Sequence, residues 1–416
     1  MKYKELVLKD IPLDLNEWKK KLLIHFFSKL EEGHLIVTEN GNLVGEFGNH
    51  QSDLKAEIEI LKPSFYSKFL FGGSIGAGES YINQEWQSSN LVNVIRVFLR
   101  NYKTLDEIEK KYTWISRIGN HVIHKQRKNS KTQAKQNISD HYDLGNELYS
   151  IFLDNKMMYS SGIYKNGNEN LNEAQELKLN AICEKLQLSA KDHVVEIGTG
   201  WGGLAIYMAQ NYGCQVTTTT ISDEQYQYTK RKVKELNLEN KIKLLNCDYR
   251  ELTSSYDKLV SIEMIEAVGK EYINEFIKKC SYLLKDNGVM LIQSINILDQ
   301  RLKSYSQNVD FIQKHIFPGG FLPSLTLLSD KFTKLTDLVI RDVHDIGLDY
   351  AQTLQDWHIN FKNNFYKIRN DGYDLRFYRL WEFYLNSCEA GFLERNCSAT
   401  QILLTKRDHL GKISRI

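Results

Sequence analysis

Glu196-Ile-Gly-Thr-Gly-Trp-Gly-Gly203 is the stretch of this sequence that decides the fold. It follows an apolar run over residues 193–197, typical of a buried strand, and precedes a segment over 204–210 that is compatible with a helix. Its alternating glycines leave no side chain between the backbone and a ligand, and the amides at the helix start face any polar group that binds there. The stretch therefore predicts a ligand site at the carboxyl end of a strand in an α/β sheet.

Two kinds of ligand fit such a glycine loop. The dinucleotide fingerprint expects an acidic residue about twenty positions later, at the end of the second strand. The corresponding strand, residues 214–221, has no carboxylate before Asp223. Glu196 adds a negative charge that suits the cationic S-adenosylmethionine better than a pyrophosphate. S-adenosylmethionine is the favoured ligand, and a dinucleotide or a tight turn without any ligand are the alternatives.

Length and composition describe a two-domain protein. The chain has 416 residues, and its net charge of only +2 gives no indication of nucleic acid binding. The six cysteines form no C-x-x-C pair, so neither a zinc site nor a disulfide framework is expected. The N-terminus lacks the apolar core of a signal peptide, and no run approaches the ~20 apolar residues of a membrane span. We therefore expect a cytoplasmic protein with at most a peripheral membrane contact.

Charge is uneven in one segment. Residues 110–139 contain no acid, and several apolar residues lie among their lysines and arginines. Such a segment could rest on an anionic lipid surface. A solvated linker between domains is the equal alternative.

The domain organisation follows from the pattern of elements. Residues 1–105 read as a small α+β accessory domain with a hairpin turn at Asn40-Gly41, and the glycine-rich stretch 71–79 reads as a loop. A basic linker over 106–135 leads to a catalytic domain over 136–416. There, strands alternate with helices, which predicts a doubly wound, parallel α/β sheet. The expected strands are 193–197, 214–220, 242–246, 257–262, 288–295, 337–343 and 400–406, with a lid insertion at about 297–336.

Seven ordered motifs make the resemblance specific. They are His141-Tyr-Asp-Leu-Gly-Asn146, Met158-Tyr-Ser-Ser-Gly-Ile-Tyr164, the glycine loop, Cys247-Asp-Tyr-Arg250, Ser261-Ile-Glu-Met-Ile-Glu-Ala-Val-Gly269, Phe317-Pro-Gly-Gly-Phe-Leu-Pro-Ser324 and Tyr384-Leu-Asn-Ser-Cys388. Together they resemble the cyclopropane-fatty-acid-phospholipid synthase family, whose fold is the Rossmann-like class I methyltransferase sheet. More loosely, Gly76-Ala-Gly-Glu-Ser-Tyr81 and Glu85-Trp86 resemble that family's accessory domain.

The resemblance implies methylene transfer from S-adenosylmethionine to a cis double bond in a phospholipid acyl chain. It also implies a homodimer formed through the accessory domain and peripheral association with the inner face of the membrane. The added methyl must lose a proton to close the ring, and the family is thought to hold bicarbonate as the base for that step. A small oxyanion needs a hydrogen-bond donor for each oxygen to stay in an apolar pocket.

Five residues correspond to that anion site. By resemblance, Glu266 orients the anion, Tyr350 donates its hydroxyl to the anion, and Cys388 lies nearby. Two positions depart from many members, which have cysteine where this chain has Ser161 and histidine where it has Gln293. Both can still donate hydrogen bonds, but Gln293 cannot titrate near neutral pH, so no imidazolium charge is available there.

A second set of residues corresponds to the donor site. By resemblance, Tyr159 and Ser160 face the methionine portion, and Gly198 and Gly200 allow close approach of the backbone. The rest of the set follows the sheet edge: Glu196 at the glycine loop, Thr220 and Gln225 near the ribose, and Asp248 and Tyr249 at the adenine edge.

Other functions stay open from the residues alone. Taken singly, Glu266 could cap a helix, and Tyr350 and Cys388 could be ordinary core residues. The same donor and substrate could give a methyl- or methylene-branched chain, and a lipid-binding protein without catalysis is a third reading. Nucleic-acid methylation is disfavoured because no Asn/Asp-Pro-Pro-Tyr motif follows the fourth strand.

Overall fold

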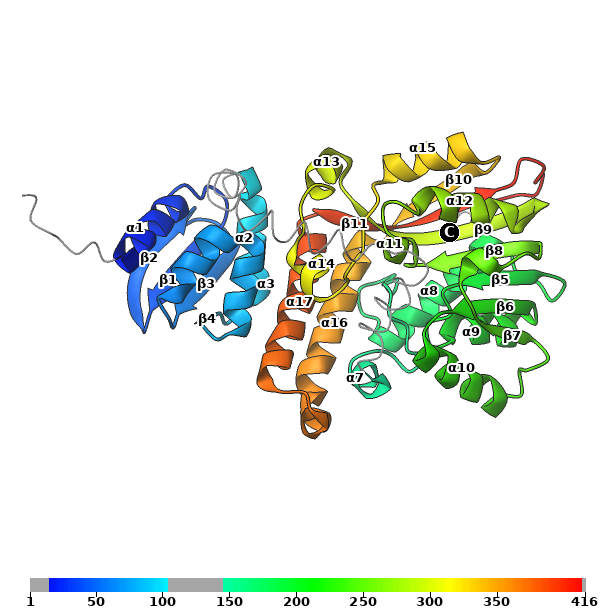
Figure 1. Cartoon of the computed structure of the whole chain (residues 1–416), viewed down its shortest axis with the longest axis horizontal. Coiled ribbons are helices and arrows are strands. Elements are labelled where there is room, and N and C mark those ends of the chain that lie inside the picture. Colours follow the sequence, from blue (N-terminus) through cyan, green and yellow to red (C-terminus); the bar gives the residue numbers. More distant parts are fainter. Residues whose placement is uncertain (1–14, 104–144, 414–416) are drawn as a thin grey trace, which may run out of the picture. The chain divides into compact units, whose positions relative to one another are not determined.

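The computed structural model describes residues 15–103 and 145–413, which fall in two compact units, 1–116 and 117–416. The predicted basic linker and the first residues of the His141 motif lie outside the described residues, and so does the acid-free segment 110–139. The predicted domain boundaries therefore stay predictions. Each unit is described by itself (Figure 1).

The first unit is a four-stranded mixed sheet with helices. Its elements are α1 (Leu15–Phe27), β1 (His34–Glu39), β2 (Asn42–Gly48), β3 (Lys55–Ile60), α2 (Ser64–Ile82), β4 (Trp86–Gln87) and α3 (Leu91–Arg100), with strand order β2-β1-β3-β4. β1 pairs antiparallel with β2 and parallel with β3. Asn40 and Gly41 both have positive φ, 50° and 80°, as a two-residue hairpin turn requires. The predicted hairpin is confirmed.

The predicted glycine-rich loop at 71–79 is wrong, because these residues lie inside α2. Gly73, with φ 54°, breaks the helical geometry and kinks the segment. After the kink the chain comes back so close that a Cβ on Gly76 would lie 2.1 Å from the Lys68 carbonyl oxygen. Gly76 thus serves close packing within α2, and this contact outweighs the low helix propensity of glycine there.

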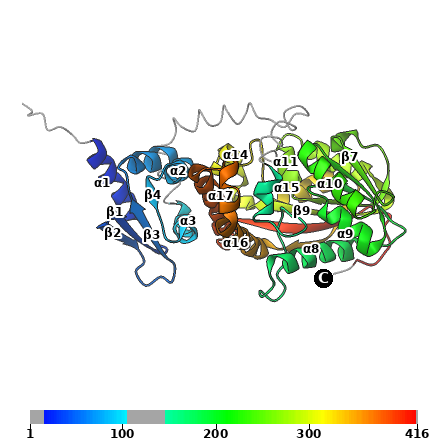
Figure 2. The ribbon, with the colours of Figure 1, turned by 90° about the horizontal axis from the view of Figure 1, so that it is seen from below.

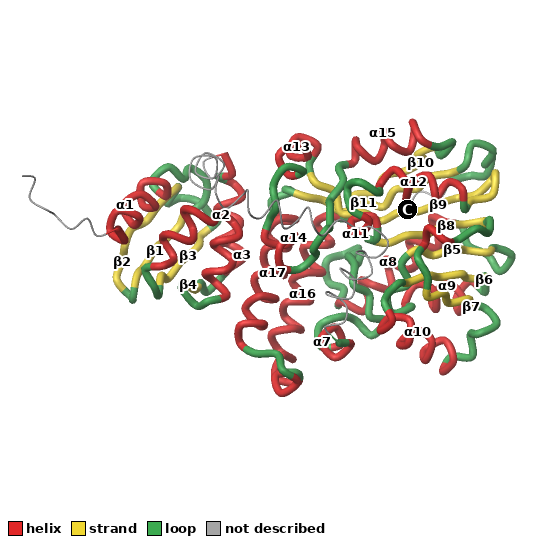
Figure 3. The backbone as a smooth tube through the Cα atoms, in the orientation of Figure 1, coloured by secondary structure: helices red, strands yellow, loops and turns green. Residues whose placement is uncertain are grey.

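The second unit is a seven-stranded sheet in the order β10-β11-β9-β8-β5-β6-β7 (Figures 1 and 3). Its strands are β5 (His193–Ile197), β6 (Gln215–Thr220), β7 (Ile242–Asn246), β8 (Tyr256–Ile262), β9 (Leu284–Ile297), β10 (Val339–Asp345) and β11 (Cys397–Thr405). All seven predicted strands are confirmed within a few residues at their ends. The glycine loop leads from β5 into α9 (Gly203–Tyr212), as expected.

The sheet is parallel from β9 to β7, but β11 runs antiparallel to both β9 and β10. An all-parallel sheet is therefore wrong for the last strand. The cause is the pair of long helices α16 (Gly347–Asn364) and α17 (Leu375–Leu393), which pack on each other as an antiparallel hairpin (Figures 1 and 2). Because the hairpin returns the chain to the edge of the sheet it left, β11 enters from that edge.

Helices cover both faces of the sheet. α8 (Leu171–Leu186), α9 and α10 (Asp223–Glu235) share one apolar cluster with the strands, and α11 (Ile265–Val268), α12 (Ile273–Tyr282) and α15 (Leu325–Leu335) share the other. The remaining short elements are α7 (Asn146–Ser150), η1 (Tyr249–Glu251), η2 (Asp299–Arg301), α13 (Leu302–Tyr305), α14 (Phe311–His315), η3 (Phe365–Lys367) and η4 (Arg369–Asp371). This arrangement is the expected doubly wound fold.

The insertion predicted at 297–336 contains η2, α13, α14 and α15. It follows β9 at the carboxyl edge of the parallel strands, where ligands bind in such folds. The Phe321 amide donates to the Glu266 carbonyl oxygen at 2.9 Å, so the insertion is anchored beside the predicted site. Its role as a lid stays a proposal.

Candidate functional site: a donor pocket beside two glutamates

A pocket opens at the carboxyl ends of the parallel strands. Loops that follow β5, β6, β7 and β8 line it, together with the segment before α8. Every predicted donor-site residue lies in its wall: Tyr159, Ser160, Glu196, Gly198, Gly200, Thr220, Gln225, Asp248 and Tyr249. The structure therefore brings together residues from five separate parts of the sequence.

The glycine loop shapes the pocket floor. Gly198 and Gly200 have positive φ, 99° and 53°, which side chains rarely adopt. A Cβ added at Gly200 would meet no protein atom within 4 Å, so this position faces open space. At Gly202 the reason for glycine is different, because a Cβ there would lie 2.6 Å from the Thr229 side chain. The first two glycines thus leave room for a ligand, and the third allows α10 to pack.

A buried Glu–Lys group underlies this floor. Glu196 accepts a hydrogen bond from the Thr218 hydroxyl at 2.5 Å, and burial raises its pKa to about 8. Lys178 on α8 is fully buried and donates to the Ser160 hydroxyl at 2.8 Å. Burial lowers the pKa of Lys178 to about 8, although the nearby carboxylates of Glu263, Asp154 and Glu196 act in the opposite direction.

Sequence reasoning missed Lys178. The sequence pattern that could have identified it is the helical spacing of α8, which places Lys178 and Gln175 on the same buried face as Ala174 and Ile182. A polar residue on an apolar stripe calls for a buried partner, and Lys178 has one in Ser160.

The other donor-pocket residues have partners of their own. Thr220 donates to the Gln225 side-chain oxygen at 2.9 Å, which joins the end of β6 to α10. Arg250 binds both oxygens of Asp248 at 2.8 and 2.7 Å. The Tyr249 hydroxyl is buried without a hydrogen-bond partner, and burial raises its pKa above the usual range. An orphaned hydroxyl in the wall of a pocket is available to a polar ligand.

Three of the five predicted catalytic residues converge on a carboxylate that sequence reasoning did not select. Glu263 Oε1 accepts from the Ser161 amide at 3.0 Å and from Gln293 Nε2 at 2.8 Å. Glu263 Oε2 accepts from the Tyr350 hydroxyl at 2.6 Å. The Ser161 hydroxyl is directed elsewhere, to the Gly162 carbonyl oxygen at 2.9 Å. Glu263 also lines the donor pocket, so it belongs to both sites.

Gln293 is held in one orientation. Its side-chain oxygen accepts from Gln401 Nε2 at 3.0 Å, and the Gln401 oxygen in turn accepts from Lys185 Nζ at 2.9 Å. Because the oxygen of the Gln293 amide is engaged by Gln401, its NH2 group is directed at Glu263.

Glu266 lies beside this group in a different setting. One of its oxygens accepts from the Ile295 amide, and the other is buried without a partner. Burial, followed by the charge of Glu263, raises the pKa of Glu266 to about 8. Two close carboxyls cannot both ionise easily, and the one with more donors ionises first. Glu263 is therefore the first of the two to ionise as pH rises, and Glu266, with its pKa of about 8, is mostly neutral at pH 7.

Cys388 is less directly placed. It lies on α17 against the aromatic cluster that contains Tyr350 and Tyr384. Burial raises the pKa of its thiol, which opposes thiolate chemistry. Within the described residues it makes no hydrogen bond to Glu263.

Comparison with known proteins follows this geometry. The family model described as mycolic acid cyclopropane synthetase matches residues 129–402. The chain belongs to this family. The match covers the glycine loop, both glutamates and the α16–α17 hairpin, so family membership rests on the elements that build the site. It confirms the resemblance found in the motifs.

Individual members of the family are similar over most of the chain. Cyclopropane-fatty-acyl-phospholipid synthase of Escherichia coli (strain K12) is 35% identical over 357 residues, 84% of this chain and 88% of that protein. Tuberculostearic acid methyltransferase UfaA1 of Mycobacterium tuberculosis is 34% identical over 327 residues, 77% of this chain and 76% of that protein. Mycolic acid cyclopropane synthase CmaA1, solved with SAH and CTAB, superposes with a TM-score of 0.61 at 25% identity, covering 65% of this chain and 98% of that chain.

As a member of this family, the protein is an S-adenosylmethionine-dependent transferase with a Rossmann-like fold. The open space at Gly200 and the unpartnered Tyr249 hydroxyl fit a polar ligand, and the family match identifies that ligand as S-adenosylmethionine rather than a dinucleotide. A dinucleotide enzyme is thereby set aside.

Proposed function

We propose that the protein transfers a methylene group from S-adenosylmethionine to the cis double bond of an unsaturated phospholipid acyl chain, which gives a cyclopropane ring. The observation that carries this proposal is Glu263, whose carboxylate lies both in the wall of the donor pocket and within a ring of polar side chains. A base is thus available beside the donor. The similarity to the Escherichia coli synthase supports the choice of acceptor.

Bound S-adenosylmethionine supplies an electrophilic methyl group on its sulfonium. In our proposal, Tyr159 and Ser160 orient its methionine portion, Thr220 and Gln225 hold the ribose, and Asp248 and Tyr249 contact the adenine. A methyl group must be held in line with a weakly nucleophilic alkene, so this positioning provides a large part of the rate.

An aromatic cluster adjoins Glu263 through Tyr350. The Tyr350 ring stacks on Phe392 at 4.5 Å and meets Trp357 edge-on at 6.0 Å. The Tyr159 hydroxyl bonds that of Tyr384 at 2.8 Å. Ring faces stabilise a cation by roughly 0.5–2 kcal/mol each, so we propose that this cluster lowers the barrier to a carbocation.

The membrane contact and the assembly are also proposals. None of the helices in residues 15–103 and 145–413 has the length and apolar character needed to cross a bilayer. Peripheral binding at the inner face of the membrane would bring the acyl chain to the pocket, and the acid-free segment 110–139 is our candidate for the contact. A homodimer through the first unit completes the proposal, and light scattering of the purified protein would test it.

A branched product is the second candidate. It is favoured by the 34% identity to a tuberculostearic acid methyltransferase and by Gln293, which stands where many relatives have histidine. In this reading the same cation loses a different proton. A lipid-binding role without catalysis is less well supported, since the Glu263 carboxyl is kept beside the donor pocket within a ring of hydrogen-bond donors.

One experiment separates these candidates. Purified protein is incubated with methyl-labelled S-adenosylmethionine and vesicles of a cis-monounsaturated phospholipid, and the released fatty acids are analysed by mass spectrometry and proton NMR. Upfield ring-methylene signals are expected. Vinyl or branched-methyl signals would support the second candidate, and absence of label in lipid would reject both reactions.

A further inference from the structure

We propose that Glu263 is the general base of the reaction, and that its carboxylate takes the place in which the family's bicarbonate was expected. This inference rests on the proposed function and names the group that completes it. It adds a catalytic residue and removes a co-reactant.

The first argument is geometric. A glutamate carboxylate and a bicarbonate ion present the same planar pair of oxygens to hydrogen-bond donors. Five residues were expected to surround the ion, and three of them are Ser161, Gln293 and Tyr350. These three direct a donor at the two oxygens of Glu263, Ser161 through its backbone amide, at 3.0, 2.8 and 2.6 Å. The donors that would hold a free ion are therefore already used.

The second argument is electrostatic. A free anion next to Glu263 would place two negative charges in a largely enclosed site, where like charges repel strongly. Lys178 is the buried cation that acts on Glu263, and Glu196 and Asp154 act on the same lysine. No imidazolium is available at position 293 to offset another charge. Three carboxyl groups thus already share this one buried cation, and a further anion would add charge that nothing here offsets.

The third argument is the backbone. Glu263 follows β8 with φ 50°, a left-handed conformation that is strained for a side chain of this size. Its amide donates to the Gln293 carbonyl oxygen at 2.8 Å, which holds the strained residue against β9. Such strain is kept where it aims a side chain, and here it aims the carboxylate at the donor pocket.

The reaction balances with Glu263 in this role. The π electrons of the alkene form a bond to the transferred methyl carbon, and the carbon–sulfur bond breaks with its electron pair going to sulfur. One C–H bond of that methyl then breaks, and its electrons form the last bond of the ring. The proton goes to a Glu263 oxygen and later to solvent, so no oxidant or reductant is needed. Glu266 stays neutral beside Glu263, so the two glutamates together carry a single negative charge before the proton is transferred.

The test compares wild-type protein with two variants, with and without added bicarbonate in a buffer stripped of carbon dioxide. We expect wild-type lipid labelling to be unchanged by bicarbonate. Glu263→Gln should lose at least about 100-fold in kcat while S-adenosylmethionine binding by titration calorimetry is retained. Glu263→Gly, which tolerates the left-handed backbone, should regain activity when bicarbonate fills the vacated position. Glu239→Gln, at an exposed carboxylate of the same unit, is the matched control.

Three results would overturn the inference: wild-type labelling that depends on bicarbonate, a Glu263→Gln variant that keeps its activity, or a folded Glu263→Gly variant that bicarbonate does not restore. If a variant does not fold, the bicarbonate test on the wild type still decides. Wild-type protein that labels no lipid in either buffer would instead refute the proposed function itself.

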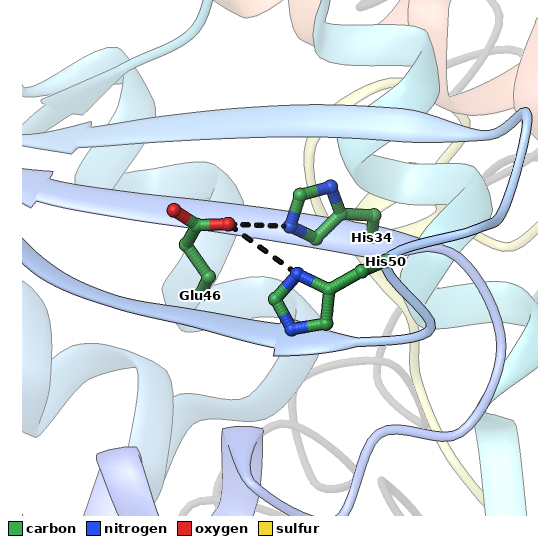
Figure 4. A group of neighbouring side chains, drawn as sticks. All are labelled: His34, Glu46 and His50. Atoms are coloured by element: carbon green, nitrogen blue, oxygen red, sulfur yellow. Dashed lines mark hydrogen bonds and ion pairs between the residues drawn. The ribbon is translucent and has the colours of Figure 1, made fainter.

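A different cluster carries a second inference: we infer that His34, Glu46 and His50 in the first unit bind a divalent transition metal of the zinc type. His34 lies on β1, Glu46 lies on β2, and His50 follows β2. Both imidazoles point at one glutamate oxygen (Figure 4), which lies 3.0 Å from His34 Nε2 and 3.4 Å from His50 Nδ1. In the described part of the chain this is the one group of three such ligands.

The donor set and its spacing fit zinc. Tetrahedral bonds of about 2.0–2.1 Å place neighbouring ligand atoms roughly 3.3–3.4 Å apart, close to the spacing seen. Two imidazoles and one carboxylate leave the fourth position to water. His34 is buried, and its Nε2 faces the carboxylate that Glu46 shares with His50, so the chain holds one imidazole firmly at the site. Glu46 and His50 are exposed, so an ion can enter from solvent.

Zinc titration of the full chain by calorimetry tests this site. We expect the wild type to bind one more equivalent of Zn2+ than His50→Ala or Glu46→Gln, and Zn2+ to raise the melting temperature of the wild type alone. Glu57→Gln, at an exposed carboxylate on β3, is the control and should match the wild type. Equal stoichiometry in the wild type and His50→Ala would refute the site, whatever the cysteines bind.

Discussion

Tyr350→Phe is the sharpest test of the charge on Glu263. The substitution removes one hydroxyl, which donates to Glu263 Oε2 at 2.6 Å. The ring itself stays packed, because its stacking on Phe392 and its contact with Trp357 need only carbon atoms. A hydrogen bond to a charged group contributes about 1.5–3 kcal/mol, and partial exposure of Glu263 to the pocket reduces this to about 1–2 kcal/mol.

The sign of the effect follows from the lost donor. Burial already raises the pKa of Glu263, and the Tyr350 hydrogen bond lowers it by stabilising the charged form. Without that bond the pKa of Glu263 rises further, because the charged form loses the stabilisation that the hydroxyl provides. The base is active when ionised, so the acid limb of the kcat/KM profile should move to higher pH. Activity should fall roughly tenfold below the limb and recover above it.

The assay is label transfer to phospholipid vesicles over a pH series. Tyr384→Phe is the control, because it removes a buried hydroxyl of the same aromatic cluster that bonds Tyr159 and not Glu263. Its acid limb should coincide with that of the wild type. A Tyr350→Phe variant whose activity falls equally at every pH would refute the reasoning, and so would one whose profile is unchanged.

Three further predictions concern other parts of the protein. Lys178→Met should weaken S-adenosylmethionine binding more at pH 7 than at pH 9, because Lys178 lowers the pKa of Glu196 and its loss leaves more of that carboxyl protonated at pH 7; calorimetry at both pH values checks this. Glu266→Gln should be more stable than the wild type by about 2–4 kcal/mol in urea unfolding at pH 8.5, and by much less at pH 4.5. Burial raises the pKa of Glu266 from its ordinary value of 4.5 to about 8, so the folded wild-type protein loses stability as the pH rises between these two values. Equal stability differences at pH 8.5 and pH 4.5 would contradict this. Gly76→Ala should lower the melting temperature of the first unit, since its Cβ would meet the Lys68 carbonyl oxygen, whereas Gly72→Ala, with open space around it, should not.

Regular features of this fold are legible in the sequence, and the exceptions have local causes. The strands were found because they are short runs of β-branched and other apolar residues, alternating with polar ones in β10, and the glycine loop was found because backbone approach requires glycine. The helix α2 was read as a loop because propensity disfavours glycine, whereas packing after the kink at Gly73 requires it. The antiparallel β11 depends on the two-helix hairpin before it, whose return path has no signature in the strand itself.

The candidate site shows the same division. The motif positions identified Ser161, Gln293 and Tyr350 as a ring of donors, and the structure brings them together. The group at their centre was missed, although Glu263 stands three residues before Glu266 in the same motif. Glu263 lies at the centre of the ring because its backbone has a left-handed φ, which directs the side chain toward the donors. The sequence contains no glycine or asparagine at this position that would have predicted this angle.

The ring around Glu263 also has a consequence for folding. Its donors come from the segment before α8, from β9 and from α16, which are separated by more than a hundred residues at the extremes. Until all three segments have docked, the buried Glu263 carboxylate lacks some of its hydrogen-bond donors, and this raises the free energy of a compact but incompletely folded state. An intermediate with the sheet formed and the α16–α17 hairpin undocked is therefore disfavoured. The hairpin and the sheet should unfold in one transition, so that a chain able to bind the donor is also one whose base is in place.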